Sequence, residues 1–195
     1  MACGKSSLLL QVAFNYEEGG ATVALFTAAL DNRTGVGIIA SRLGLQREAQ
    51  VFDGNTVFTP DLVGKGVSCV LIDEAQFLSI DQARQLHKLA HLHNIPVIAW
   101  GLRSDFRGNP FPGSQMLLTL ADDIEETKTI CRCERKASMN ARFDEHGNRV
   151  EVGPQLLIGG NDRYRAMCPR CFYAGETAPV QGTLAITQQA GFKQH

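Results

Sequence analysis

The sequence has little that would place the chain in a membrane or on nucleic acid. It contains no run of about 18 apolar residues, the length that crosses a bilayer as a helix. The apolar run at residues 8–10 is followed by polar residues too early for a signal peptide. The formal net charge of −1 provides no excess of positive charge for binding a duplex. We therefore expect a cytoplasmic protein that needs neither a membrane nor nucleic acid.

The chain also lacks the first half of a phosphate-binding loop. Gly4, Lys5 and Ser6 stand at the start of a predicted helix over residues 5–16. In a complete loop, backbone N–H groups and the helix dipole bind phosphate, the lysine adds positive charge and the serine holds Mg²⁺. The full motif G-x-x-x-x-G-K-[ST] needs an earlier glycine and a strand in front of it. A bare G-K-S is weak evidence alone, because it often occurs by chance.

A pair of acids supplies the second half of such a site. Residues 67–72 are apolar or small and β-prone, which predicts a strand buried on both faces, and Asp73 and Glu74 follow directly. Acids at the carboxyl end of a parallel strand face the crevice where α/β sheets bind ligands, and here they take the Walker B position. A solvated turn is the alternative for this segment alone. Together with Gly4-Lys5-Ser6, the pair favours a Mg²⁺–nucleotide site.

Strand and helix patterns alternate through the first two thirds of the chain. This alternation predicts a doubly wound, mainly parallel α/β sheet of the P-loop NTPase type in a domain over residues 1–127. The expected strands cover residues 21–28, 38–40, 50–52, 67–72, 95–101 and 126–130, and the expected helices cover residues 5–16, 60–63, 79–93 and 114–120.

Four of the six cysteines form two close pairs near the C-terminal end. Cys131 and Cys133 form C-x-C, and Cys168 and Cys171 form C-x-x-C. Disulfides would suit a secreted chain, but in an intracellular protein two such pairs indicate a tetrahedral structural Zn²⁺. Zinc would supply folding energy that a small lobe over residues 128–174 cannot obtain from its core. Residues 175–195 match no pattern and are expected to form a flexible tail.

Two further features admit a functional and a plain structural interpretation. Phe106 and Phe111 lie in the loop after the predicted strand at residues 95–101, where they could stack on a flat base or fold back on the core. Arg33 follows the strand at residues 21–28, where it could assist phosphate charge or lie on the surface.

The motifs taken together resemble those of the cytosolic-type thymidine kinases, closest to the bacterial branch. They are G-K-S, D-E-x-Q-F, G-L-R-x-D-F-R-G-x-P-F, I-C-x-C-x-R-K-A-S-M and I-G-G-N-D-R-Y-x-x-x-C-x-x-C, in this order from Met1 to Cys171. The resemblance implies transfer of the γ-phosphoryl group of ATP to the 5′-hydroxyl of thymidine with Mg²⁺. It also implies a homotetramer that is inhibited by dTTP.

The resemblance also assigns roles to single residues. Gly4, Lys5 and Ser6 would bind ATP and Mg²⁺, Asp73 would support the Mg²⁺ through water, Glu74 would be the general base and Arg33 would act near the transferred phosphate. The residues that it places around the thymidine are Met1, Phe77, Leu102, Phe106, Phe111 and, in the lasso loop of the zinc-binding lobe, Leu157, Ile158 and Tyr164. Zinc on Cys131, Cys133, Cys168 and Cys171 would tie that loop down.

The chain departs from the family at its start, where the first strand and the front of the phosphate loop are missing. We expect a misassigned start codon or a truncated chain. If the 195 residues were the whole protein, a sheet edge would stay unpaired, and stability and activity would be poor. Other functions stay open at this point. They are a P-loop ATPase whose zinc ribbon acts on nucleic acid, a non-catalytic zinc-binding module and a truncated, inactive family member.

Overall fold

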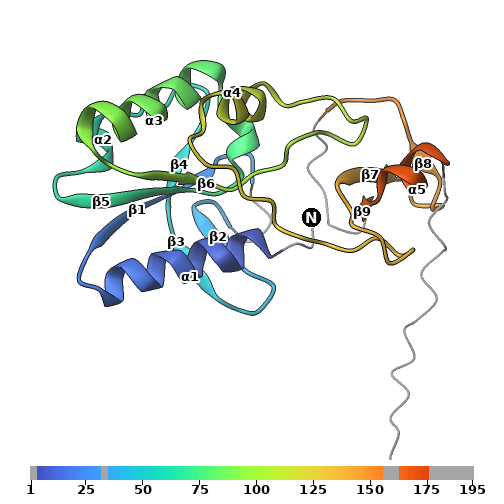
Figure 1. The fold of residues 1–195 in the computed structure, drawn as a ribbon, viewed down its shortest axis with the longest axis horizontal. Helices are drawn as coiled ribbons and strands as arrows, with labels where there is room; N and C mark the ends of the chain where they lie inside the picture. The colour runs from blue at the N-terminus through green and yellow to red at the C-terminus, as the bar shows by residue number, and fades with distance from the viewer. Residues whose placement is uncertain (1–3, 32–34, 156–162, 176–195) are drawn as a thin grey trace, which may run out of the picture.

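A four-stranded parallel sheet forms the centre of the protein, as seen in a computed structural model that describes residues 4–31, 35–155 and 163–175 (Figure 1). The strand order is β4 (Gln50–Phe52), β1 (Thr22–Ala28), β5 (Val67–Ile72) and β6 (Val97–Ala99), and every neighbouring pair is parallel. Parallel neighbours require crossover connections. The connection from β5 to β6 contains a helix over residues 80–93, and the connection from β1 to β4 contains an antiparallel hairpin over residues 38–48. The predicted α/β class with a central parallel sheet is therefore confirmed.

Helices cover both faces of this sheet. Helix α1 (Lys5–Glu18) packs Leu9, Leu10 and Ala13 against one face, and α3 (Ile80–His93) packs Leu86 and Leu89 against the other (Figure 1). Alternate residues of each strand serve the two cores because successive side chains point to opposite faces. Residues 24, 26, 28, 70 and 72 face the α3 side, and residues 25, 69 and 71 face the α1 side. The sheet is thus doubly wound.

The start of α3 is fixed by a capping box. The Ser79 hydroxyl accepts a hydrogen bond from the Gln82 N–H, and the Gln82 side chain accepts one from the Ser79 N–H. The Gln82 amide also donates to the carbonyl oxygens of Asp53 and Thr56, at 2.6 and 2.8 Å. The helix thus starts where the sequence predicts. The Gln82 side chain also connects α3 to the segment between β4 and the short helix α2 (Pro60–Val63).

A small antiparallel hairpin lies beside α1. It joins β2 (Ile38–Ala40) to β3 (Gln46–Glu48), and Ile39 enters the core under α1. Strand β2 is predicted from the sequence, whereas β3 is not, because its three residues are polar and exposed.

Two predicted strands differ from the observed ones. The strand expected at residues 95–101 is limited to β6, and its Ile98 is 36% exposed, because β6 pairs with β5 alone among the described residues. The strand expected at residues 126–130 does not form. Within that segment Ile130 makes only an isolated bridge with Lys136 and is 72% exposed. β propensity alone forms no ladder when no described strand lies beside the segment.

The C-terminal lobe contains a three-stranded antiparallel sheet of order β8 (Arg149–Val150), β7 (Met139–Phe143) and β9 (Tyr164–Met167), followed by α5 (Pro169–Tyr173). Its small core contains three cysteines together with Ala141, Phe143 and Phe172. Helix α4 (Pro112–Leu120) follows β6 in the chain, the single turn η1 (Ala75–Phe77) follows β5, and the two contact each other. Among the described residues, no helix has both the length and the apolar character that a membrane crossing needs.

Candidate active site and cysteine cluster

The start of α1 meets the carboxyl end of β5. The Ser6 hydroxyl donates a hydrogen bond of 2.9 Å to Oδ2 of Asp73. Gly4 precedes the helix with φ of 71°, a left-handed conformation that glycine adopts at low cost. The hydroxyl and the carboxylate are oxygen donors of the kind that Mg²⁺ binds, and they lie at a helix N-terminus, which favours phosphate. These residues fit a Mg²⁺–phosphate site, and the structure brings Gly4, Lys5, Ser6 and Asp73 together as predicted.

Asp73 is buried, with 4% of its surface exposed. Burial raises the pKa of its carboxyl to about 6, and the neighbouring charge of Glu74 adds to this effect, while the Ser6 hydroxyl and the charge of Lys5 oppose it. A nearby cation stabilises the charged form of a carboxylate that is so poorly hydrated. Its environment therefore suits a residue that faces Mg²⁺.

Glu74 occupies a strained backbone position directly after Asp73. Its φ of 52° is left-handed, which is uncommon for residues other than glycine and often marks a functional site. Its N–H donates to Oδ1 of Asp73 at 3.0 Å, and the next N–H, that of Ala75, donates to the Trp100 carbonyl at 2.9 Å. These bonds hold the turn in place at the end of β5.

The Gln76 side chain connects Glu74 to the loop after β6. Its amide nitrogen donates to Oε2 of Glu74 at 2.5 Å, and its amide oxygen accepts from the Leu102 N–H at 3.0 Å. A Cβ on Gly101 would lie 2.9 Å from the Gln76 backbone nitrogen and 3.1 Å from its side-chain oxygen, so the close approach requires glycine there. Gln76 belongs to the D-E-x-Q-F motif, but the sequence assigned it no role. Its position two residues after the acids is the signal that could have identified it.

The predicted thymidine-pocket residues fall into two groups. Phe77 and Phe111 contact each other edge to face, with ring centroids 6.2 Å apart. The Leu102 carbonyl accepts a hydrogen bond of 2.6 Å from the hydroxyl of Ser114, which lies in the first turn of α4. Phe106 is only 2% exposed and packs under the Arg142 guanidinium, at 3.8 Å. Phe106 and Phe111 thus both fold back onto the protein. Tyr164 begins β9, and Met1, Arg33, Leu157 and Ile158 lie outside the described residues.

The four predicted zinc ligands lie together. The sulfur atoms of Cys131, Cys133, Cys168 and Cys171 are all within 4.8 Å of one another, and the Cys133 and Cys168 sulfurs are 3.4 Å apart. Roughly 3.8 Å between sulfurs is expected around tetrahedral zinc with its bond length of about 2.3 Å. None of the described cysteines forms a disulfide, so no such bond competes with a metal for them.

The local electrostatics of this cluster favours thiolates. Burial raises the pKa of the Cys131 thiol, but hydrogen bonds from the backbone N–H groups of Cys133 and Cys168 and from neighbouring thiols outweigh it and lower the pKa to about 7. The pKa of Cys168 is also lowered, chiefly by the N–H of Cys171. Thiolates are the form that binds zinc. The cluster could therefore hold a zinc ion.

Comparison with known proteins agrees with this geometry. The family described as "Thymidine kinase" matches residues 1–172 of the chain. A thymidine kinase of Albidiferax ferrireducens is 57% identical over 179 residues, which cover 90% of this chain and 91% of that protein. A thymidine kinase of Chromobacterium violaceum is 58% identical over 173 residues, which cover 89% of this chain and 94% of that protein. The chain belongs to the thymidine kinase family.

Proposed function

We propose that this chain transfers the γ-phosphoryl group of ATP to the 5′-hydroxyl of thymidine. The observation that carries the proposal is the contact between Ser6 at the start of α1 and Asp73 at the end of β5, with Glu74 held beside it. The family match and the relatives' names support thymidine as the acceptor. They do not favour an ATPase that acts on nucleic acid.

Each residue of the site has a task in this reaction. The first-turn N–H groups of α1 and the Lys5 ammonium bind the phosphates, and Ser6 and Asp73 hold Mg²⁺, Asp73 through water. Mg²⁺, when bound, offsets negative charge on the transferred group. Glu74 accepts the proton of the thymidine 5′-hydroxyl, and Arg33 acts near the transferred phosphate. Phe77, Leu102, Phe106, Phe111, Leu157, Ile158 and Tyr164 form the nucleoside pocket.

The cysteine cluster completes the proposal as a structural zinc site. Cys131, Cys133, Cys168 and Cys171 would bind the ion and hold the lobe over residues 128–174 to the P-loop-type domain over residues 1–127. A homotetramer, inhibition by dTTP, a cytoplasmic location and the absence of a nucleic-acid partner are further parts of the proposal. They rest on the family resemblance.

Phosphate transfer from γ-labelled ATP to each of the four deoxynucleosides tests this function. Thymidine should be the preferred acceptor, and labelled dTMP should be the product. Hydrolysis of ATP that is stimulated by nucleic acid and not by thymidine would contradict the proposal and favour the ATPase.

The Glu74→Gln variant tests the assignment of the base. It should lower turnover by a factor on the order of 10²–10⁴, because the amide cannot accept the proton. Far-ultraviolet circular dichroism should be unchanged, and ATP binding should be kept. Turnover equal to that of the wild type would remove Glu74 from the mechanism.

A further inference from the structure

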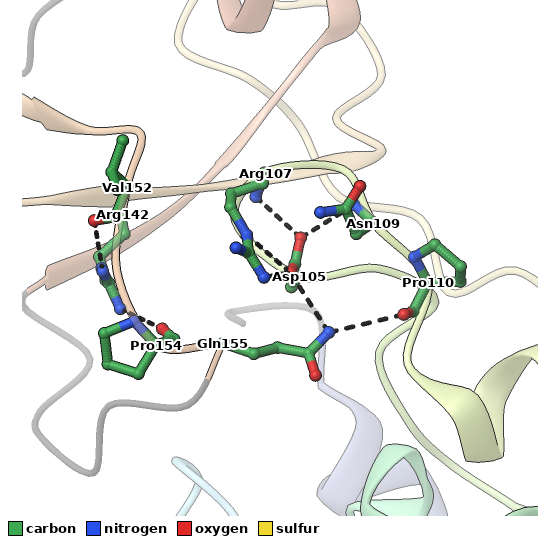
Figure 2. A network of polar contacts seen from close by, with 8 residues as sticks. All are labelled: Asp105, Arg107, Asn109, Pro110, Arg142, Val152, Pro154 and Gln155. Atoms are coloured by element: carbon green, nitrogen blue, oxygen red, sulfur yellow. Dashed lines mark hydrogen bonds and ion pairs between the residues drawn. The ribbon is translucent and has the colours of Figure 1, made fainter.

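A buried polar junction connects the loop after β6 with the C-terminal lobe (Figure 2). Its centre is Asp105, which is 2% exposed. The Asp105 carboxylate accepts hydrogen bonds from the backbone N–H groups of Arg107 and Asn109, both at 2.9 Å, and from the Arg107 guanidinium at 3.1 and 3.2 Å. These bonds close the loop at residues 105–109 on itself. The loop therefore has a fixed shape.

Arg142 reaches this loop from β7 of the lobe. It is 4% exposed, and its guanidinium lies 3.8 Å from the centre of the Phe106 ring. The same group donates to the Pro154 carbonyl at 3.0 Å and to the Val152 carbonyl at 3.3 Å (Figure 2). Gly153 lies beside the guanidinium with φ of 134°, a backbone conformation that favours glycine, and a Cβ there would lie 2.6 Å from Nη2 of Arg142.

Gln155 provides a second connection between the same segments. Its amide donates to Oδ2 of Asp105 at 3.2 Å and to the Pro110 carbonyl at 3.5 Å. Residues 152–155 are thus held from two sides, by Arg142 on the lobe and by Asp105 on the loop (Figure 2). We call Asp105, Arg142 and Gln155 the loop clamp.

Burial of the Arg142 charge in the loop clamp has a free-energy cost that a purely stabilising role would not explain. Burying a charge is unfavourable unless it is paired, and in the described part of the chain Arg142 contacts two carbonyls and a ring rather than a carboxylate. An apolar side chain could fill the same space over Phe106 at lower cost. A planar group with several donors, in contrast, can fix two carbonyls and one ring at once.

The clamped loop carries residues that the proposed function places around the nucleoside. Leu102 and Phe111 lie near its ends and Phe106 lies within the clamp, whereas Ser6, Asp73 and Glu74 make none of the clamp's contacts. We propose that Arg142, supported by Asp105 and Gln155, is a positioning residue for the nucleoside, which acts by holding Phe106 and residues 152–155 in place. This inference rests on the proposed function.

Steady-state kinetics of the full chain with varied thymidine and varied ATP tests the proposal. Arg142→Met keeps most of the length and removes the charge, and Arg142→Lys keeps the charge but loses the planar group. Both should raise the KM for thymidine about tenfold to a hundredfold, the range expected when hydrogen bonds to a charged group are lost. The KM for ATP and kcat should stay within about twofold, and lysine should not restore binding.

Gln155→Ala keeps the proposal testable if Arg142 variants fold poorly. It should raise the KM for thymidine by a smaller factor, about threefold to tenfold, with an unchanged Tm. Direct calorimetric titration of thymidine into the same proteins should give a parallel loss of affinity.

Arg149→Met is the matched control. Arg149 also packs its guanidinium 3.8 Å from a ring, that of Phe172, and donates to the Phe172 carbonyl, but these contacts stay within the C-terminal lobe. This variant should lower stability without a selective change in the KM for thymidine.

Three results would contradict the proposed role of Arg142 or the proposed function. An unchanged KM for thymidine in the Arg142 and Gln155 variants, or equal changes in the KM values for thymidine and ATP, would refute the positioning role while leaving the proposed function intact. A wild-type chain that neither binds nor phosphorylates thymidine would refute the proposed function and the inference with it.

Discussion

At the scale of single residues, the Asp73 carboxylate is proposed to face Mg²⁺, and its burial lowers the stability of the metal-free protein. Its carboxyl has a folded-state pKa of about 6, above the ordinary 3.8, because burial disfavours the charged form. The folded state therefore holds its proton more tightly than the unfolded state. The raised pKa of Asp73 therefore contributes stability that is fully present below about pH 4 and is lost as the pH rises through about 6. At higher pH the protein carries a buried charge that costs it on the order of 2–3 kcal/mol.

Asp73→Asn should therefore stabilise the protein in magnesium-free buffer at pH 8, by about 1–3 kcal/mol, and by much less at pH 5. Activity should fall, because the amide is a poorer partner for Mg²⁺. Urea denaturation at both pH values measures the difference. The exposed Asp123→Asn should change stability little at either pH. A pH-independent effect of Asp73→Asn would show that burial of charge is not the cause.

Gln76 is predicted to orient Glu74. Gln76→Glu keeps an acceptor for the Leu102 N–H but replaces the donor that faces Glu74 with a second acceptor. It should lower kcat about tenfold to a hundredfold with a small change in the KM for ATP, because a misplaced base loses much of its effect.

Gln82→Leu is the control for Gln76→Glu, since Gln82 is also buried and hydrogen-bonded but lies at the α3 cap. It should reduce stability and leave kcat of the folded protein unchanged. Equal effects of the two variants on kcat would exclude the orienting role.

At the scale of elements, the packing of α4 on η1 depends on one small residue. A Cβ on Gly113 would lie 2.2 Å from the Leu78 carbonyl oxygen, which is backbone and cannot move aside cheaply. Gly113→Ala should therefore lower the free energy of unfolding by about 1–3 kcal/mol, although alanine favours helix. Gly54→Ala, where the added Cβ meets nothing within 4 Å, should be close to neutral. Chemical denaturation of both variants tests this, and equal stabilities would contradict the close contact.

The elements that sequence predicts best are those whose residues carry local signals. Strands β1 and β5 are apolar on both faces, and α3 starts with a Ser79–Gln82 capping box, so their positions follow from burial and hydrogen bonding alone. Strand β3 has no apolar residue and exists only because β2 pairs with it. Residues 126–130 show the converse, because β propensity without a neighbouring strand produces no ladder.

The same distinction applies to the site. Ser6 and Asp73 are predictable because each lies in a short motif with a fixed chemical role. Gln76 and Arg142 are not, because their partners come from tertiary contacts. Gln76 bonds to Leu102, 26 residues away, and Arg142 stacks on Phe106 of another lobe. Sequence patterns thus predict the groups to which a chemical role is proposed, and the structure adds the groups that hold their neighbours in place.

At the scale of the whole molecule, β7 connects the cysteine cluster with the loop at residues 105–109. Strand β7 begins after Cys131 and Cys133 and carries Arg142, and β9 pairs with β7 and leads directly to Cys168. A metal that orders the cysteines therefore also orders the strand from which Arg142 reaches Phe106. The lobe's own core is small, so little else would hold this geometry.

Removal of zinc should consequently affect the two substrates differently. Treatment with a zinc-selective chelator should raise the KM for thymidine at least about tenfold, because β7 loses its support. The KM for ATP should change less, because Lys5 and Ser6 lie in α1 and Asp73 lies at the end of β5, away from the cysteine cluster. Readdition of zinc, with metal content measured by atomic absorption, should restore thymidine binding in the wild type but not in Arg142→Met. If zinc-free protein kept its KM for thymidine, or if zinc loss raised the KM values for both substrates equally, the lobe would serve stability alone and would not shape the nucleoside pocket.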